Sequence, residues 1–367
     1  MLVLSNADVQ RVLTMSLCLD ALDAMFHEIA RGDAAGMGRI DVYIPSGQAL
    51  APHYRWAVMA GGSRGTGYLC ARMLSDMVAW PSVAGHQREN KFAHRPGTFC
   101  GLLFLYRAAD GVPVAMIQDG FLQHVRVGGG AGIGVKYLSR AASHSVGMIG
   151  SGGMARTYLE AFCAVRDIRS VKVYSPNEDH RRGYAAEMRA RFDIDVEPVA
   201  SPREAVHGVD IVACCTSSTE PDFFAEWLEP GMHVTDLGRE STGPGFIRAV
   251  DVAFRPGDST PAVDDLPPEA FYATHGFLAY VAGTPEERAH VPRLALDRDL
   301  VRMPKLPDLL AGRAHGRTSD AQTTWFLNVG AIGIQFAAVA AAVYERARAE
   351  GLGVDLPDAY VLQDVRD

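Results

Sequence analysis

The chain has 367 residues, a length that allows two domains. Its hydrophobic fraction of 48% and charged fraction of 21% are typical of soluble globular proteins, and its net charge of −8 gives nucleic-acid binding no electrostatic support. No C-x-x-C pair occurs among the cysteines, and no basic segment followed by an apolar run opens the chain. We therefore expect reduced cysteines, no metal site and a cytoplasmic location.

The N-terminal part predicts two helices followed by a mostly antiparallel sheet. A helix-cap signal at 4–9 precedes a short helix, and apolar residues at helical spacing predict a second helix over 17–30. Alternating apolar residues predict strands at 38–45, 54–62, 67–75, 99–106 and, after an Asp-Gly turn, 113–118.

The next predicted helix, 121–142, is unusually rich in glycine. Each glycine in a helix interior costs roughly 1 kcal/mol relative to alanine. So many glycines indicate that this helix packs closely against another backbone or a ligand.

Residues 146–155 form the motif on which the functional prediction depends. An apolar run ends at Gly150, and Gly150, Gly152 and Ala155 match G-x-G-x-x-G/A before a helix at 157–165. The first glycine permits a tight turn, the second lets backbone approach a pyrophosphate, and the small third residue lets the helix pack closely.

The context of this motif predicts an α/β fold with a Rossmann-type doubly wound sheet. A strand at 171–175 follows at the usual βαβ spacing, and later β-rich runs lie at 210–216, 233–238 and 250–254. The alternative is a βαβ unit that binds no nucleotide.

The end of the second strand bears on the choice of cofactor. NAD-binding proteins usually place an acid there to hold the ribose 2′-hydroxyl, whereas this chain has Ser175, followed by Asn177 and Arg181. Because a nearby arginine accommodates a 2′-phosphate, we favour NADP over NAD. Glu178 and Asp179 leave NAD possible, and an exposed helix face is the simpler interpretation of the arginine.

The C-terminal third is harder to interpret. Residues 261–306 are irregular and rich in proline and charge, which indicates a lid or surface insertion with short helices at 269–275 and 285–288. A helix starts at 306–310, and 324–350 predicts a long final helix whose apolar part approaches a membrane span in length. Because polar residues interrupt it, we expect a buried helix at a subunit interface, without membrane contact.

Several further motifs occur together along the chain. Arg126 opens the glycine-rich helix, and Thr216-Ser217-Ser218 follows a later strand of the nucleotide sheet. Three further motifs follow: Gly-Met-His-Val at 231–234, Gly-Arg-Thr-Ser at 316–319 and Phe-Leu-Asn-Val-Gly at 326–330. With these motifs, the sequence resembles the ornithine cyclodeaminase/mu-crystallin family over nearly its whole length, apart from about 261–306.

The resemblance implies a two-domain subunit that forms a homodimer. Residues 1–124 and 322–367 would form an α+β substrate-binding and dimerisation domain, and 125–321 the Rossmann domain. Members of the family bind NAD or NADP and act on amino acids or imines.

The resemblance also implies site residues. Arg39 and Arg126 correspond to the family's carboxylate-binding arginines, and Arg126 can also hold a cofactor phosphate. The resemblance and the glycine motif together give the candidate cofactor-binding residues, which are Thr98, Arg126, Gly150, Gly152, Gly153, Met154, Ser175, Asn177, Arg181, Thr216, Ser217, Leu237, Gly238 and Asn328.

Two departures from the family pattern limit the choice of reaction. Arg72 replaces a lysine of the third strand; it can bind a carboxylate but is a poor proton shuttle. The family's aspartate corresponds only to a displaced Asp258, and Lys91 is a candidate replacement for the lysine, although a solvated loop lysine is the simpler interpretation.

We therefore predict an NAD(P)-dependent oxidoreductase acting on a C–N bond of an amino acid or imine. A cyclodeaminase lyase that recycles its cofactor and a non-catalytic nucleotide-binding protein are the alternatives. Cyclodeamination is disfavoured because the family lysine is missing.

Overall fold

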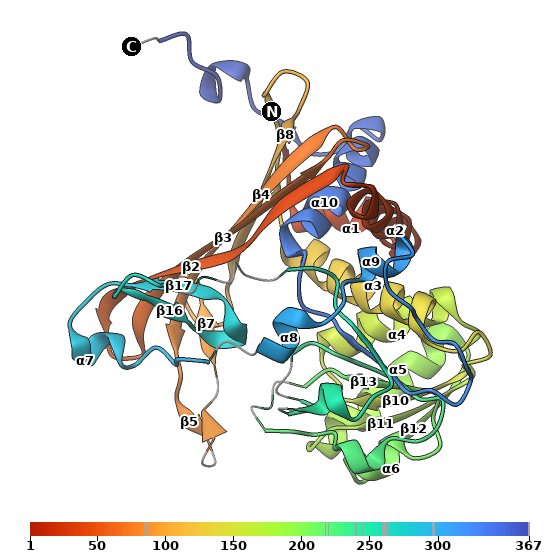
Figure 1. Ribbon diagram of the computed structural model, residues 1–367. Helices are drawn as coiled ribbons and strands as arrows, with labels where there is room; N and C mark the ends of the chain where they lie inside the picture. The colour runs from red at the N-terminus through yellow and green to blue at the C-terminus, as the bar shows by residue number, and fades with distance from the viewer. Residues whose placement is uncertain are drawn as a thin grey trace.

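The computed structural model describes residues 1–83, 86–87, 89–216, 218, 220–238, 241–243, 245–258, 263, 265–295 and 298–365. Two large sheets dominate the described chain, with helices between and around them (Figure 1). One sheet is long and mostly antiparallel, and the other is parallel. This architecture confirms the predicted combination of a Rossmann-type α/β sheet with an α+β part.

The long sheet has ten strands, and the N-terminal segment supplies most of them. Its order is β16-β17-β2-β3-β4-β8-β9-β1-β19, with β7 also pairing with β4. The bounds are β1 (Leu2–Leu4), β2 (Ala34–Gln48), β3 (Ala51–Ser63), β4 (Tyr68–Ala79), β7 (Asn90–Phe92), β8 (Cys100–Arg107), β9 (Pro113–Gln118), β16 (Ala270–Tyr272), β17 (Leu278–Val281) and β19 (Val354–Asp355). A small separate sheet contains β5 (Ser82–Val83) and β6 (His86–Gln87). The five strands predicted in the N-terminal part are confirmed.

Three helices pack on the long sheet: α1 (Asn6–Val12), α2 (Met15–Arg31) and α10 (Ile332–Ala349). Thr14 caps α2 by accepting a hydrogen bond from the Leu17 amide at 3.2 Å, and Gly32 ends it in the left-handed conformation. Helix α10 lies directly on β3, because a Cβ on Gly61 would lie 2.5 Å from the Ile334 nitrogen. Its apolar side chains fill the core of the described chain, and no helix within the described ranges meets the requirements for crossing a bilayer.

The parallel sheet has seven strands in the order β12-β11-β10-β13-β14-β18-β15. The bounds are β10 (Ser145–Ile149), β11 (Ser170–Tyr174), β12 (Asp195–Pro198), β13 (Ile211–Cys214), β14 (His233–Asp236), β15 (Val252–Phe254) and β18 (Thr324–Leu327). Helices α4 (Gly153–Val165), α5 (Glu178–Phe192) and α6 (Pro202–Val206) complete its crossovers. The strand order reverses between β10 and β13, the point at which such sheets bind dinucleotides.

Helix α3 (Gly120–Leu138) connects the two sheets and is buried along nearly its whole length. A Cβ on Gly128 would lie 2.5 Å from the Thr157 carbonyl oxygen of α4, and one on Gly132 would lie 2.8 Å from the Ala161 Cβ. On another side, a Cβ on Gly129 would lie 2.8 Å from the Cys18 Sγ of α2. The prediction that these glycines permit close packing is confirmed.

Two predictions for the C-terminal third are wrong. Residues 324–327, expected to start the final helix, form β18, which lies between β14 and the edge strand β15 of the parallel sheet, because a fully buried strand has the same apolar composition as a buried helix. Residues 270–272, expected to be helical, form β16, and β17 then pairs with β2 of the long sheet. This segment is therefore part of the ten-stranded sheet rather than an irregular insertion.

The other short elements agree better with expectation. Helices α7 (Pro285–Arg288) and α9 (Leu306–Leu310) lie where they were predicted, and α8 (Arg298–Arg302) precedes α9. Short 3-10 helices lie at Ala225–Trp227, Phe246–Arg248, Thr274–Gly276 and Asp358–Tyr360. All six cysteines are free.

Candidate active site

The glycine loop between β10 and α4 has the geometry of a pyrophosphate site. Gly150 has a φ of +107°, and a Cβ on it would lie 2.3 Å from the Cys215 carbonyl oxygen, so only glycine fits. Gly152 is the N-cap of α4, and a Cβ on it would have no atom within 4 Å. No side chain caps this helix, so the amides of Gly153 and Met154 at its start are open to an anion.

The end of β11 lies beside this loop. The Ser151 hydroxyl donates to the Ser175 hydroxyl at 2.9 Å, and Ser175 in turn donates to the Asn177 carbonyl at 3.1 Å. Asn177 caps α5, and Arg181 on that helix donates from Nη1 to the Ser175 carbonyl at 3.1 Å. A guanidinium therefore lies at the end of β11, where an NAD-binding protein usually has an acid.

The remaining candidate cofactor-binding residues do not all lie at the same place in the structure. Thr216 follows β13, and its hydroxyl accepts from the Ser218 amide at 2.9 Å; Leu237 and Gly238 follow β14. Ser217 lies outside the described residues. Thr98 lies before β8, where its hydroxyl donates to the carbonyls of Ala93 and Arg95. Thr98 is absent from the lining of the cavity described next.

A cavity of about 190 Å³ lies between the parallel sheet and the face of β2, β3 and β4. The lining residues are Arg39, Arg55, Met59, Arg72, Glu89, Lys91, Gln123, Arg126, Val127, Leu237, Thr274, Phe277, Asn328, Val329 and Ile332. Leu237 and Asn328 follow β14 and β18, so the cavity opens at the carboxyl edge of the parallel sheet, which also carries the glycine loop. The fold thus brings together six predicted site residues from distant parts of the chain.

Two of the three predicted arginines in this cavity already have acidic partners. Arg39 donates to Asp41 from Nε at 2.6 Å and from Nη2 at 3.1 Å. Arg72 pairs with Asp119 at 2.5 Å and also donates to Gln123. Arg39 thus binds the Asp41 carboxylate in a bidentate manner, and Asp119 balances the charge of Arg72 within the protein.

A second charged group lies further along the same strands. Arg55 pairs with Asp76 at 2.6 Å and with Glu89 at 2.9 Å, and Lys91 lies 3.6 Å from Glu89. Burial lowers the pKa of Lys91, with Glu89 opposing the shift. The Lys91 side chain stays 44% exposed, so solvent screens part of this effect.

Arg126 on α3 differs from the other cations of the cavity. Its Nη1 donates to a neutral group, the side-chain oxygen of Gln335, at 3.4 Å, and its guanidinium lies 4.5 Å from the centre of the Phe336 ring. Within the described chain, its Nε has no hydrogen-bond partner. Burial, followed by the charge of Arg72, lowers the pKa of Arg126 to about 9. A buried cation without an acid favours the binding of an anion.

Two uncharged polar groups also line the cavity. Asn328 donates from its amide nitrogen to the Val127 carbonyl and to the Tyr158 hydroxyl, both at 2.9 Å. For its Oδ1 and for the Thr274 Oγ1, both buried, the described residues supply no hydrogen-bond partner. With Arg126, these atoms can hydrogen-bond a ligand.

Asp258 does not lie in this cavity. Its carboxylate pairs with Lys305 at 2.6 Å and with Arg255 at 3.0 Å, and its side chain is 61% exposed. It lines a separate hollow of about 260 Å³ beside α9. Arg255, the residue directly after β15, is buried, and its ion pair holds the Asp258 carboxylate at this separate hollow.

The sequence analysis missed several residues of the cavity: Arg55, Met59, Glu89, Gln123, Thr274 and Phe277. Arg55 could have been found, because its alternation with Met59 on β3 places both on one face of the sheet. Thr274 and Phe277 could not, since the segment that contains them has no clear periodicity.

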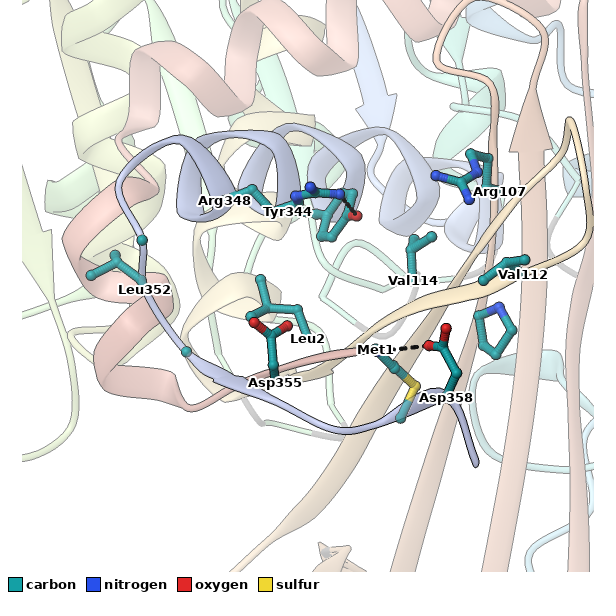
Figure 2. A pocket seen from close by; sticks show the side chains of 13 residues that line it. Met1, Leu2, Arg107, Val112, Val114, Tyr344, Arg348, Leu352, Asp355 and Asp358 are labelled. Atoms are coloured by element: carbon teal, nitrogen blue, oxygen red, sulfur yellow. Dashed lines mark hydrogen bonds and ion pairs between the residues drawn. The ribbon is translucent and has the colours of Figure 1, made fainter. Parts of the chain in front are cut away.

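A larger hollow of about 450 Å³ lies at the other end of the long sheet, near both chain ends (Figure 2). Three of its charged groups interact within the chain: Arg107 with Asp110, Arg348 with the Tyr344 hydroxyl, and the Met1 ammonium with Asp358. None of the predicted site residues lines it.

The Rossmann-type sheet with its glycine loop, the long second sheet and the cation-rich cavity between them define the architectural class of the protein. Comparison with known families agrees, because the model of the ornithine cyclodeaminase/mu-crystallin family matches residues 1–249. The chain belongs to this family.

Known proteins of this kind are similar to the chain over most of its length. Delta(1)-pyrroline-2-carboxylate reductase of Bacillus cereus is 27% identical over 260 residues, covering 70% of this chain and 74% of that protein. Alanine dehydrogenase of Archaeoglobus fulgidus is 27% identical over 356 residues, covering 96% and 97%.

Solved structures share the fold. The Thermococcus litoralis Delta(1)-pyrroline-2-carboxylate reductase, in complex with NADH and L-proline, superposes with a TM-score of 0.74 at 22% identity and covers 97% of this chain and 100% of its own. Iminosuccinate reductase of Paracoccus denitrificans with NAD⁺ gives 0.71 at 20% identity, covering 97% and 99%.

The geometry of the glycine loop predicts the effect of substituting Gly152. Its φ of −82° suits any residue, and a Cβ would meet no atom, so Gly152→Ala should leave the melting temperature unchanged. The added methyl group would occupy the approach of the pyrophosphate, so we expect nucleotide affinity to fall roughly tenfold or more. Calorimetric titration with NADH and NADPH measures this. Gly183→Ala, on the exposed face of α5, is the control, and equal affinity in both variants would contradict the assignment.

Proposed function

We propose that the protein is an NAD(P)-dependent oxidoreductase that reduces the C=N bond of an imine bearing a carboxylate, or oxidises the corresponding amino acid. The single observation that supports this most directly is Arg126, a buried cation for which the described residues supply no acidic partner, in a cavity that opens at the edge carrying the glycine loop. The names of relatives, which include imine reductases and an alanine dehydrogenase, agree with it.

Arg126 would bind the substrate carboxylate. Within the described part of the chain, Arg39, Arg55, Arg72 and Lys91 have acidic partners, so the charge of Arg126 remains for a ligand. A single carboxylate at Arg126 would balance this charge. Arg39 and Arg72 would then shape the pocket, with their guanidinium forks directed to Asp41 and Asp119.

The residues present also fit a nicotinamide dinucleotide. When bound, the dinucleotide supplies or accepts the hydride. The open start of α4 would hold its pyrophosphate, Leu237 would line an apolar wall for its ring, and the Oδ1 of Asn328 would accept a hydrogen bond from it or from the substrate.

A proton must reach the imine nitrogen when the carbon accepts hydride. Lys91 is the candidate donor, because it lines the cavity and burial makes it a stronger acid than an ordinary lysine. Asp258 lies in another hollow, and Arg72 is tied to Asp119. We therefore assign the proton to Lys91 rather than to either of these groups.

We further propose NADP as the preferred nucleotide and a homodimer as the assembly. Ser175 and Arg181 at the end of β11 suit a 2′-phosphate. For the assembly, an archaeal alanine dehydrogenase of similar fold is described as a dimer, and Ile44, Leu50 and Phe99 expose large apolar side chains near the long sheet. Light scattering at twice the monomer mass is the expected result.

The reductase assignment is tested by substituting Arg126. Arg126→Met should raise the KM for imines formed from pyruvate with ammonia or methylamine, or for cyclic ketimines, by roughly 100-fold, since it removes a charged hydrogen bond to the carboxylate. The melting temperature should not fall, because the variant removes a buried charge that lacks an acid. NADPH and NADH oxidation by stopped assay measures the activity.

The matched control is Arg346→Met, since Arg346 is a 63% exposed arginine near the C-terminal end of α10 and does not line the cavity. Absence of nucleotide oxidation across the whole panel of imines would contradict the reductase assignment. Release of ammonia from ornithine or lysine without net oxidation of nucleotide would instead support a lyase.

The role of Lys91 predicts a pH dependence. Its ammonium form donates, so the reduction rate should fall as pH rises through the Lys91 pKa, which burial lowers below that of an ordinary lysine. Lys91→Met should lower kcat roughly 100-fold with little change in KM and should remove this alkaline limb. Added ethylamine should restore part of the rate to Lys91→Ala. An identical alkaline limb in Lys91→Met would exclude the role.

The nucleotide preference is tested by binding. The wild-type protein should bind NADPH more tightly than NADH, and Arg181→Ala should weaken NADPH binding roughly tenfold while changing NADH binding little. Arg182→Ala is the matched control, because Arg182 is 68% exposed and pairs with Glu178. Tighter binding of NADH by the wild-type protein would overturn the preference.

A further inference from the structure

The outer wall of the cavity comes from a segment beyond the part of the chain that the family model matches. Strand β17 runs parallel to β2, with Leu278 opposite Ile40 and Val281 opposite Tyr43, and β16 pairs with β17 at the edge of the long sheet (Figure 1). The family match ends at residue 249. The turn between the two strands supplies Thr274 and Phe277 to the cavity.

This wall has its own apolar core. Tyr43 of β2 packs with Phe271, Ala279, Val281 and Val291 of the segment, and all of them are buried. Thr284 caps α7 through a reciprocal hydrogen-bond pair with Glu287. The turn that carries Thr274 is thus anchored on both sides and can select substrates by its shape.

Arg39 connects the wall to the sheet. Phe277 stacks on its guanidinium at 4.6 Å, while the edge of the same guanidinium is bonded to Asp41. Both the face and the fork of Arg39 are therefore used within the protein. This explains why an arginine of the substrate pocket has little capacity left for a substrate carboxylate.

Thr274 is the polar side chain that the turn offers to the cavity. Its Oγ1 is buried, and no hydrogen-bond partner for it occurs among the described residues. A buried hydroxyl without a partner is unfavourable, and a site built to hydrogen-bond a substrate group strongly rejects an analogue that lacks that group. The nearby charges of Arg55 and Lys91 are already paired, so a neutral group fits better than a charged one.

We infer that Thr274 is a specificity-determining residue, whose hydroxyl hydrogen-bonds a neutral polar group, such as a hydroxyl, on the side chain of the imine or amino acid. Phe277 limits the length of that side chain. The inference rests on the proposed function, since it names the class of substrate for the same cavity. It makes polar, short-chain imino acids better substrates than apolar ones of the same size.

The test compares two 2-oxo acids of nearly equal size in the presence of ammonia: hydroxypyruvate, with a terminal hydroxyl, and 2-oxobutyrate, with a terminal methyl. The wild-type kcat/KM should favour hydroxypyruvate, and Thr274→Val should lower this preference about tenfold, the factor for loss of one hydrogen bond. Thr274→Ser keeps the hydroxyl and should keep the preference. Thr284→Ser, in the same segment but outside the cavity, is the matched control.

An unchanged ratio in a folded Thr274→Val variant overturns the inference, as does a wild-type enzyme that prefers 2-oxobutyrate. If no imine is turned over at all, the proposed function fails, and calorimetric binding of L-serine and L-2-aminobutyrate with nucleotide present then decides the inference separately. A loss of serine affinity in Thr274→Val, with 2-aminobutyrate affinity kept, supports the role of Thr274, and equal losses overturn it.

Discussion

The close packing of α3 between the two sheets is the constraint on which the site depends. Its glycines let the side chains of α2 and the backbone of α4 approach to distances at which a Cβ would clash. Helix α4 begins at the glycine loop, and Arg126 lies on α3, so this packing sets how far the glycine loop lies from the cavity. A larger side chain on α3 would separate the two halves of the site.

The second constraint is electrostatic. Five cationic side chains of the described residues line the cavity, and burying that many charges is unfavourable unless acids accompany them. Asp41, Asp76, Glu89 and Asp119 accompany four of them, and Phe336 lies against both Arg72 and Arg126. The protein thus keeps a polar pocket stable while leaving one charge for a ligand. Arg72, where the family has a lysine, joins β4 to the start of α3 through Asp119 and so has a structural role in this chain.

Much of this arrangement could be predicted from the sequence, and the limits have physical causes. The glycine motif and the alternating strands predicted both sheets, because their periodicity reflects which face is buried. The four residues of β18 were missed because every one of them is buried, which removes the alternation. Strands β16 and β17 were missed because they are short, and because β17 joins the sheet through β2, more than 200 residues earlier in the chain.

The candidate site shows the same division. The resemblance suggested Arg39, Arg72 and Arg126 as site residues, and the fold places all three in one cavity. The sequence could not show which of them had acidic partners, since Asp119 and Asp41 are ordinary carboxylates until the fold pairs them. Nor could spacing place Asp258, because a residue four positions past the end of β15 can face either side of the sheet edge. Chemical roles at such a site depend on how charges pair in the folded chain, and Arg126 is distinguished from its neighbours by the acid that it lacks.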